Sequence, residues 1–264
     1  MDSQRVRGGW GDKRRYARTA LRVLTQSAPV VIASRPPRNG NEGTTHHCIV
    51  LHGWGLDATG VDQITGVLQD LPACATRRFW DVTYDSQWTS FEDNAAAIVA
   101  ELAHGPHRFE DVILVGYSMG GLIARRMVAL GFPCRAMLTL CTPHAGPVPW
   151  LPLRFLPFGG AGPRSLMPGS AALQRLNADA RDREHRARYH LFAITYSDLL
   201  GAHAHDGIVP LHSALGEELG PVASRHTQHL NYRGVATYDP HWRGKTRMCL
   251  KPVADAMAAI ETEK

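Results

Sequence analysis

One stretch, residues 111–130, constrains the fold more than any other. Within it, the unbroken apolar run Val112-Ile-Leu-Val115 leads directly into the pentapeptide Gly116-Tyr117-Ser118-Met119-Gly120. Apolar side chains then recur every three or four residues, at Met119, Ile123, Met127 and Leu130. Unbroken apolar strands are typical of parallel sheets covered on both faces, and the later spacing is that of a helix. The stretch therefore predicts a strand that turns abruptly into a helix at Ser118, with glycines on either side letting the two backbones approach closely.

The same alternation of strand and helix extends along the chain from residue 47. Strands are expected at 48–51, 78–84, 111–117, 136–141, 189–195 and 234–238. Helices are expected at about 61–71, after Ser90 (where Asp93 completes a capping pattern), after Ser118, and at the C-terminal end. This repetition implies strand–helix–strand crossovers, because parallel strands need such connections. The 264 residues thus predict a single α/β domain, with a mostly parallel sheet and helices on both faces.

The net charge of +5 is unevenly distributed along the chain. Residues 1–39 hold eight Arg and one Lys against two Asp, which leaves the rest of the chain slightly acidic. We therefore expect residues 1–39 to be a basic N-terminal extension and residues 40–264 to be the folded domain. The extension is either a solvated tail, or an address or contact for an anionic membrane surface. Because the excess charge lies outside the domain, it does not favour a nucleic-acid partner.

The five cysteines are an odd number with no CxxC spacing. They favour buried, reduced thiols rather than a zinc ribbon or a disulfide framework, and so a cytoplasmic location.

The serine at the strand–helix turn is a candidate nucleophile, and it needs a base and an acid that orients the base. In this architecture the chain order is Ser, Asp or Glu, then His. Asp206, in a tight Asp-Gly turn after the strand expected at 189–195, is the favoured acid, and Asp198 is the alternative. The base should lie on a loop after the last strand. His241 fits best because it follows the strand expected at 234–238, while His229 and His226 remain alternatives.

Acyl transfer also needs N–H groups directed at the oxyanion of the tetrahedral intermediate. The residue after the nucleophile, Met119, offers one. The loop His52-Gly53-Trp54-Gly55 follows the first strand and offers the second, best assigned to Trp54. A plain strand–helix turn is the alternative interpretation of this loop.

These motifs together resemble the α/β-hydrolase superfamily, specifically its lipase and esterase group, over residues 47–262. The segments Leu138-Thr-Leu-Cys-Thr-Pro-His-Ala-Gly146 and Leu166-Met-Pro-Gly-Ser170 resemble triacylglycerol lipases and the GPI inositol-deacylase-like branch. The resemblance implies an α/β-hydrolase fold, a triad of Ser118, Asp206 and His241, and an oxyanion hole from Trp54 and Met119. Tyr117 occupies a position where lipases often have His.

Residues 143–168 are rich in Pro, Gly and large apolar side chains. We expect a lid-like insertion at about 145–168, in which Trp150, Phe155 and Phe158 contact the acyl chain of a substrate. Simple packing of this loop onto the domain is the alternative.

The function expected from the sequence is a serine hydrolase acting on small-molecule or lipid esters, with no cofactor and no metal. His203 and His205 beside Asp206 could be mistaken for metal ligands, but a Ser triad needs no metal. Peripheral membrane contact would involve the basic extension or the lid. An acyltransferase with the same triad and a non-catalytic lipid-binding protein of the same fold are the two alternatives. The sequence leaves the oligomeric state open.

Overall fold

The computed structural model describes residues 30–148, 160–198, 201–231 and 246–263. The strands within these residues are β1 (Val31–Arg35), β2 (His46–Leu51), β3 (Arg78–Thr83), β4 (Asp111–Tyr117), β5 (Ala136–Leu140), β6 (Tyr189–Asp198), β7 (Gly201–His203) and β8 (Ser224–Asn231). The α-helices are α2 (Asp62–Gln69), α3 (Phe91–His104), α4 (Met119–Ala129), α5 (Ala161–Leu166), α6 (Ala171–Ala178), α7 (Ala180–His185), α8 (Leu211–Ala214) and α9 (Thr246–Thr262).

The strands of the described residues form one eight-stranded sheet. Its order is β1-β3-β2-β4-β5-β6-β7, and β8 pairs with the other edge of β6. Pairing is parallel throughout β3-β2-β4-β5-β6 and between β6 and β8, whereas β1 and β7 are antiparallel to their neighbours. The mostly parallel sheet expected from the sequence is confirmed.

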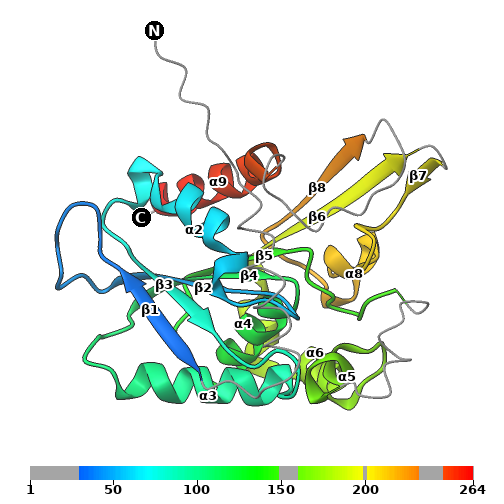
Figure 1. The fold of residues 1–264 in the computed structure, drawn as a ribbon, viewed down its shortest axis with the longest axis horizontal. Helices are drawn as coiled ribbons and strands as arrows, with labels where there is room; N and C mark the ends of the chain where they lie inside the picture. The colour runs from blue at the N-terminus through cyan, green and yellow to red at the C-terminus, as the bar shows by residue number, and fades with distance from the viewer. Residues whose placement is uncertain (1–29, 149–159, 199–200, 232–245, 264) are drawn as a thin grey trace, which may run out of the picture.

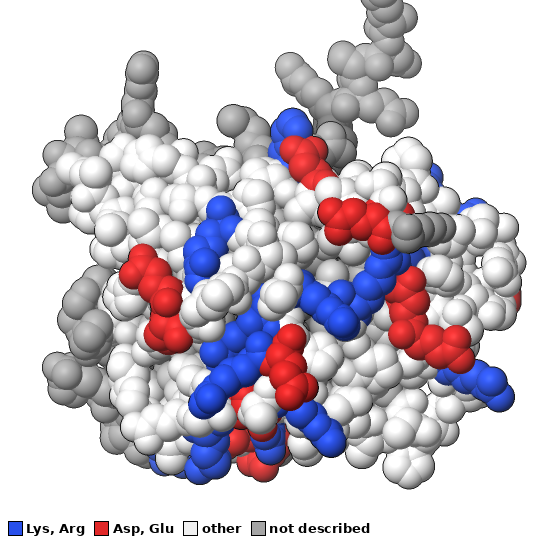
Figure 2. Space-filling model, turned by 180° about the vertical axis from the view of Figure 1, so that it is seen from behind, with Lys and Arg blue, Asp and Glu red and all other residues white. Residues whose placement is uncertain are grey.

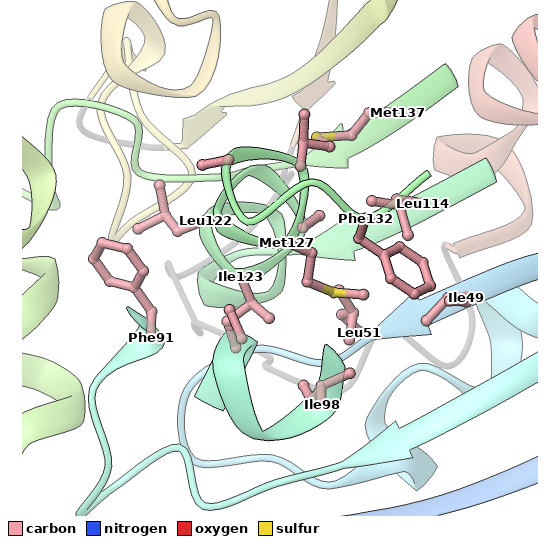
Figure 3. Close-up of a cluster of buried hydrophobic side chains, with 14 of the residues drawn as sticks. Ile49, Leu51, Phe91, Ile98, Leu114, Leu122, Ile123, Met127, Phe132 and Met137 are labelled. Carbon is pink, nitrogen blue, oxygen red and sulfur yellow. The ribbon is translucent and has the colours of Figure 1, made fainter. Parts of the chain in front are cut away.

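Helices cover both faces of the sheet (Figure 1). Alternate residues of β2 and β4 point to opposite faces, as strand geometry requires. One face packs against α3 and α4, and Figure 3 shows Ile98 and Met127 of these helices beside Leu51 of β2. The other face packs against α2 and α9, through side chains such as Leu68 and Met257. The carboxyl ends of the central strands therefore emerge from a sheet that is buried on both sides.

Most expected elements are found close to their predicted bounds. The strand expected at 111–117 is β4 itself, and the helix expected after Ser90 is α3. The Ser90 side chain caps that helix by accepting a hydrogen bond from the Asp93 N–H at 3.1 Å. The strand expected at 234–238 lies outside the described residues. A strand that was not predicted, β8 at Ser224–Asn231, instead extends the sheet next to β6.

The N-terminal extension was expected to end at residue 39, but its last part belongs to the sheet. Val31–Arg35 forms β1, which pairs with all of β3 except its first residue. Arg35 lies 2.6 Å from Asp81 of β3, and Arg38 lies 3.2 Å from Asp70. Two of the tail's cations thus neutralise carboxylates of the domain. Figure 2 likewise shows basic and acidic side chains interspersed over the face seen there.

Candidate active site

Ser118 lies between β4 and α4 in a backbone conformation that is rare for any residue with a side chain. Its φ is 53° and its ψ is −121°, and its N–H donates to the Leu140 carbonyl of the neighbouring strand at 2.8 Å. The flanking glycines are required by contact with backbone. A Cβ on Gly116 would lie 2.4 Å from the Cα of Gly121, and one on Gly120 would lie 2.3 Å from the Leu51 carbonyl oxygen. Such conformations cost about 1–3 kcal/mol and are concentrated at functional sites.

The 52–55 loop, which follows β2, lies directly beside this serine. A Cβ built on Gly53 would be 3.1 Å from the Cβ of Ser118, and Gly55 adopts a φ of 71°. The N–H of Met119 is free of an intrahelical partner because it opens α4. Within the described part of the chain, no hydrogen bond uses the N–H of Trp54. The two N–H groups expected to bind an oxyanion are therefore carried by segments that meet at Ser118.

His52 is the first residue of this loop, and its side chain is buried and held by three contacts. Its Nδ1–H donates to the Gly53 carbonyl at 2.8 Å, and its Nε2 accepts the Tyr84 N–H at 3.3 Å. Its ring stacks on that of Tyr84 with centroids 3.9 Å apart. Burial lowers the pKa of His52 to about 4. A neutral imidazole with both nitrogens occupied supports the loop and has no free nitrogen with which to act as a base.

Asp206 lies in a turn after β7, and its carboxylate is fixed by backbone N–H groups. Its Oδ1 accepts from Ile208 at 2.8 Å and from Val209 at 2.7 Å. Burial raises the pKa of Asp206, while these two N–H donors and a hydrogen bond with Cys141 oppose that rise. Cys141 directly follows β5, whose Leu140 pairs with Tyr117 at the end of β4. The carboxylate therefore lies near the level of the sheet at which Ser118 emerges.

Asp198, the alternative acid, occupies a different place. Phe192 of β6 is level with Leu140, and Asp198 stands six residues further along the same strand, at the hairpin to β7. At about 3.3 Å per residue, its backbone lies roughly 20 Å beyond the level of the serine turn. The register of the sheet therefore favours Asp206.

The histidine alternatives, His226 and His229, lie on β8, and the strand expected after them at 234–238 lies outside the described residues. The ring of His226 stacks on that of Phe192, with centroids 4.8 Å apart. His229 contacts the hydroxyls of Thr195 and Ser197, at 3.0 Å and 3.1 Å. Both side chains are thus engaged along the strand. His241, the favoured base, lies outside the described residues, in the connection between β8 and α9.

The insertion expected at 145–168 is only partly described, and Trp150, Phe155 and Phe158 lie outside the described residues. Its first part is tied to the turn that carries Asp206, because the Val148 N–H donates to the Ile208 carbonyl at 2.8 Å. Its last part forms α5, which packs against the chain that follows β3. The described ends of this segment are therefore integrated into the domain.

Three groups of residues near the site were not singled out by sequence reasoning. Cys141 has a φ of 50° and contacts Asp206. Ser86 and Gln87 bond to the 52–55 loop. Arg125, on the helix after the nucleophile, is fully buried and pairs with the equally buried Asp182 at 2.7 Å. Only the charge of Arg125, which with Arg126 interrupts a mostly apolar helix after the Gly-rich turn, was a signal available in the sequence.

His203 and His205, which were considered as metal ligands, form an aromatic cluster with Tyr196. The rings of Tyr196 and His203 stack with centroids 4.5 Å apart, and the Nδ1 of His205 accepts the Gly207 N–H at 2.9 Å. Within the described ranges, no three His, Cys, Asp or Glu side chains are grouped so that they could hold a metal ion. Within those same ranges, no helix combines the length and apolar character needed to cross a bilayer.

The chain is similar to proteins of one family. The profile of the alpha/beta hydrolase family matches residues 48–260, while no curated protein sequence matches significantly. Among solved structures, the mature lipase BlEst2 of Bacillus licheniformis has a TM-score of 0.59 at 16% identity, covering 86% of this chain and 98% of its own. The N-acyl homoserine lactonase AidH has a TM-score of 0.56 at 13% identity, covering 89% and 94%. The peroxisomal α/β-hydrolase Lpx1 of Saccharomyces cerevisiae has a TM-score of 0.53 at 10% identity, covering 89% and 82%.

Proposed function

Because the chain belongs to the alpha/beta hydrolase family, we propose that it is a serine hydrolase that cleaves carboxylic esters of apolar acyl groups. The observation that carries the proposal is the backbone of Ser118, with φ at 53° between a buried strand and a helix. No packing requirement explains a serine there, since glycine would adopt this conformation without strain. A side-chain hydroxyl kept at the carboxyl end of the sheet is what nucleophilic catalysis requires.

The proposed reaction uses the residues in the following roles. The Ser118 Oγ attacks the ester carbonyl while His241 takes its proton, and Asp206 orients His241. The N–H groups of Trp54 and Met119 stabilise the oxyanion of the tetrahedral intermediate. When this intermediate collapses, the alcohol leaves with the proton from His241. Water then attacks the acyl-enzyme, again giving a proton to His241, and the carboxylic acid departs as Ser118 recovers its proton.

Substrate class is part of the proposal. The Thr142-Pro-His-Ala-Gly146 and Leu166-Met-Pro-Gly-Ser170 segments resemble lipases and the GPI inositol-deacylase-like branch, which supports a lipid or other apolar acyl ester. The apolar side chains Trp150, Phe155 and Phe158 are proposed to contact the acyl chain. Two structurally similar proteins are a lipase and an N-acyl homoserine lactonase, so a substrate series should include esters of several chain lengths and an acyl lactone.

The test compares wild type with Ser118→Ala on p-nitrophenyl esters from butyrate to palmitate, and with a fluorophosphonate probe. We expect Ser118→Ala to lose turnover by at least about 10³-fold and to lose labelling. Ser34→Ala, an exposed serine on β1, is the matched control and should retain both. Turnover and labelling that persist in Ser118→Ala would refute the proposed nucleophile.

A further inference from the structure

A turn at residues 85–89, just after β3, is buried over its first three residues and is held by hydrogen bonds within the turn and from α3. The Asp85 carboxylate accepts the N–H of Gln87 at 3.0 Å and that of Trp88 at 2.8 Å. The Asn94 side chain of α3 donates to the Asp85 carbonyl at 2.7 Å. Asp85, Ser86 and Gln87 are each at most 3% exposed. Buried, fully bonded turns of this kind have little freedom to move.

From this turn, two side chains reach the 52–55 loop. The Oε1 of Gln87 accepts the indole N–H of Trp54 at 2.8 Å, and the Oγ of Ser86 accepts the N–H of Gly55 at 3.0 Å. Together they hold the side chain of Trp54 and the peptide that follows it. The Trp54 N–H, the proposed oxyanion donor, belongs to the peptide just before these two anchors, and the carbonyl of that peptide accepts from His52. Its direction is therefore restricted by the hold of His52 on one side and of Gln87 and Ser86 on the other.

The turn is also held from its opposite side, by the start of α5. The Gly162 N–H donates to the Gln87 carbonyl at 3.1 Å. A Cβ on Gly160 would lie 2.0 Å from the Gln87 carbonyl oxygen, and one on Gly162 would lie 2.0 Å from that of Ser86. The turn thus fills the space between α5 and the 52–55 loop, and it cannot move away from the loop without displacing α5.

We propose that Gln87, assisted by Ser86, is a positioning residue of the catalytic site, which fixes the 52–55 loop so that the Trp54 N–H points at the developing oxyanion. This inference rests on the proposed hydrolase function. Gln87 itself touches no reacting atom. Its effect is on the transition state, because an N–H aimed at the oxyanion acts there far more than on the bound ester.

The experiment measures kcat, KM and the affinity of an alkyl boronic acid, which forms a tetrahedral adduct on a reactive serine. Removing one whole oxyanion donor costs about 10²–10³ in kcat, so a misdirected donor should cost about 10–100-fold. We expect Gln87→Leu to lower kcat by that factor, to leave KM within about twofold, and to weaken boronate binding in parallel. Gln87→Glu keeps an acceptor for the Trp54 indole and should recover kcat to within about threefold of wild type. Gln174→Leu, on the exposed face of α6, is the matched control.

A second measurement removes the ambiguity of a folding defect. Ser86→Ala deletes only the hydroxyl that accepts from Gly55, and it should lower kcat and boronate affinity together by about three- to tenfold. In a double-mutant cycle, Trp54→Phe combined with Gln87→Leu should lose no more kcat than the more damaging single variant. A kcat in Gln87→Leu equal to that of Gln174→Leu, or a loss of kcat with unchanged boronate affinity, would overturn the inference. If Ser118→Ala is inactive in the same assay, the hydrolase function stands and only the positioning role fails.

Discussion

The strained backbone of Ser118 predicts that this serine, the proposed nucleophile, lowers the stability of the protein. The perturbation is a pair of substitutions, Ser118→Gly and Ser118→Ala, both of which remove the hydroxyl. At a φ of 53° and a ψ of −121°, any Cβ is strained, and strain of this kind costs about 1–3 kcal/mol. Glycine relieves it, whereas alanine retains it.

The expected difference between the two variants follows from two opposing terms. Because the positive φ is combined with a ψ outside the left-handed region, relief of strain should fall in the upper part of that range, at about 2–3 kcal/mol. The greater freedom of glycine in the unfolded chain opposes it by about 1 kcal/mol. Ser118→Gly should therefore be more stable than Ser118→Ala by about 1–2 kcal/mol, which corresponds to about 3–6 °C in Tm for a domain of this size.

The assay is thermal and urea unfolding of both variants, monitored by circular dichroism, together with ester turnover. Ala97→Gly on the exposed face of α3 is the control, and it should lose about 1 kcal/mol because glycine is a poor helix former. Both Ser118 variants should be inactive. If Ser118→Gly is no more stable than Ser118→Ala, the backbone is not strained and the reasoning that singles out this serine is refuted.

Three further predictions concern the rest of the fold. Burial lowers the pKa of His47 to about 4, so the unfolded chain binds more protons than the folded one between pH 6.5 and 4, and the free energy of unfolding should decrease as the pH is lowered over that range. His47→Gln should remove up to about 3 kcal/mol of this loss, measured by urea titrations at pH 7 and pH 4. An identical pH dependence of stability in wild type and variant would contradict this prediction. Arg125→Met should cost about 3–5 kcal/mol in urea unfolding because it leaves the charge of the buried Asp182 less compensated, and a loss below about 1 kcal/mol would argue against a tight ion pair. Deleting residues 1–29 should leave the urea midpoint of unfolding unchanged, whereas deleting residues 1–39 should lower it because β1 is lost from the sheet. Equal midpoints for the two deletion variants would show that β1 contributes nothing to stability.

The sequence predicted the centre of the sheet well because its strands are covered on both faces. The bounds of β4 agree with the predicted ones, since an unbroken apolar run and the glycines of the serine turn mark both of its ends. The positions of the 52–55 loop and of Ser118, at the ends of β2 and β4, also follow from this alternation of strands and helices. Asp206 was expected after the strand at 189–195, but the chain first forms the antiparallel strand β7 before it reaches Cys141 beyond the end of β5, a path that the sequence did not indicate.

The edges of the sheet were not predictable by the same argument. β8 has the sequence Ser-Arg-His-Thr-Gln-His-Leu-Asn, which contains no apolar run. Its stability comes from backbone pairing with β6 over eight residues, which is contributed by a distant part of the chain. β1 was not predicted because the surrounding sequence is rich in arginine, which is typical of a solvated tail. The pairing of Arg35 with Asp81, which shows that this segment belongs to the domain, is apparent only in the folded structure.

Contacts between side chains distant in sequence explain what was missed near the site. Gln87 and Trp54 lie 33 residues apart, and nothing in either local sequence indicates that one holds the other. Similarly, Cys141 was interpreted as a strand residue, whereas it ends the strand with a φ of 50° beside Asp206. Composition and periodicity identify which residues are buried, but pairings of this kind arise only from the assembled fold.

The most direct test of the central claim is to map the site of covalent labelling. Purified full-length protein would be treated with a fluorophosphonate, and the intact mass and peptide masses would be measured for wild type, Ser118→Ala and Asp206→Asn. The account predicts one label per chain, located on Ser118, absent from Ser118→Ala and formed at least about 10²-fold more slowly in Asp206→Asn. A label on a different residue, or wild-type protein that takes up no label while it remains folded, would contradict it.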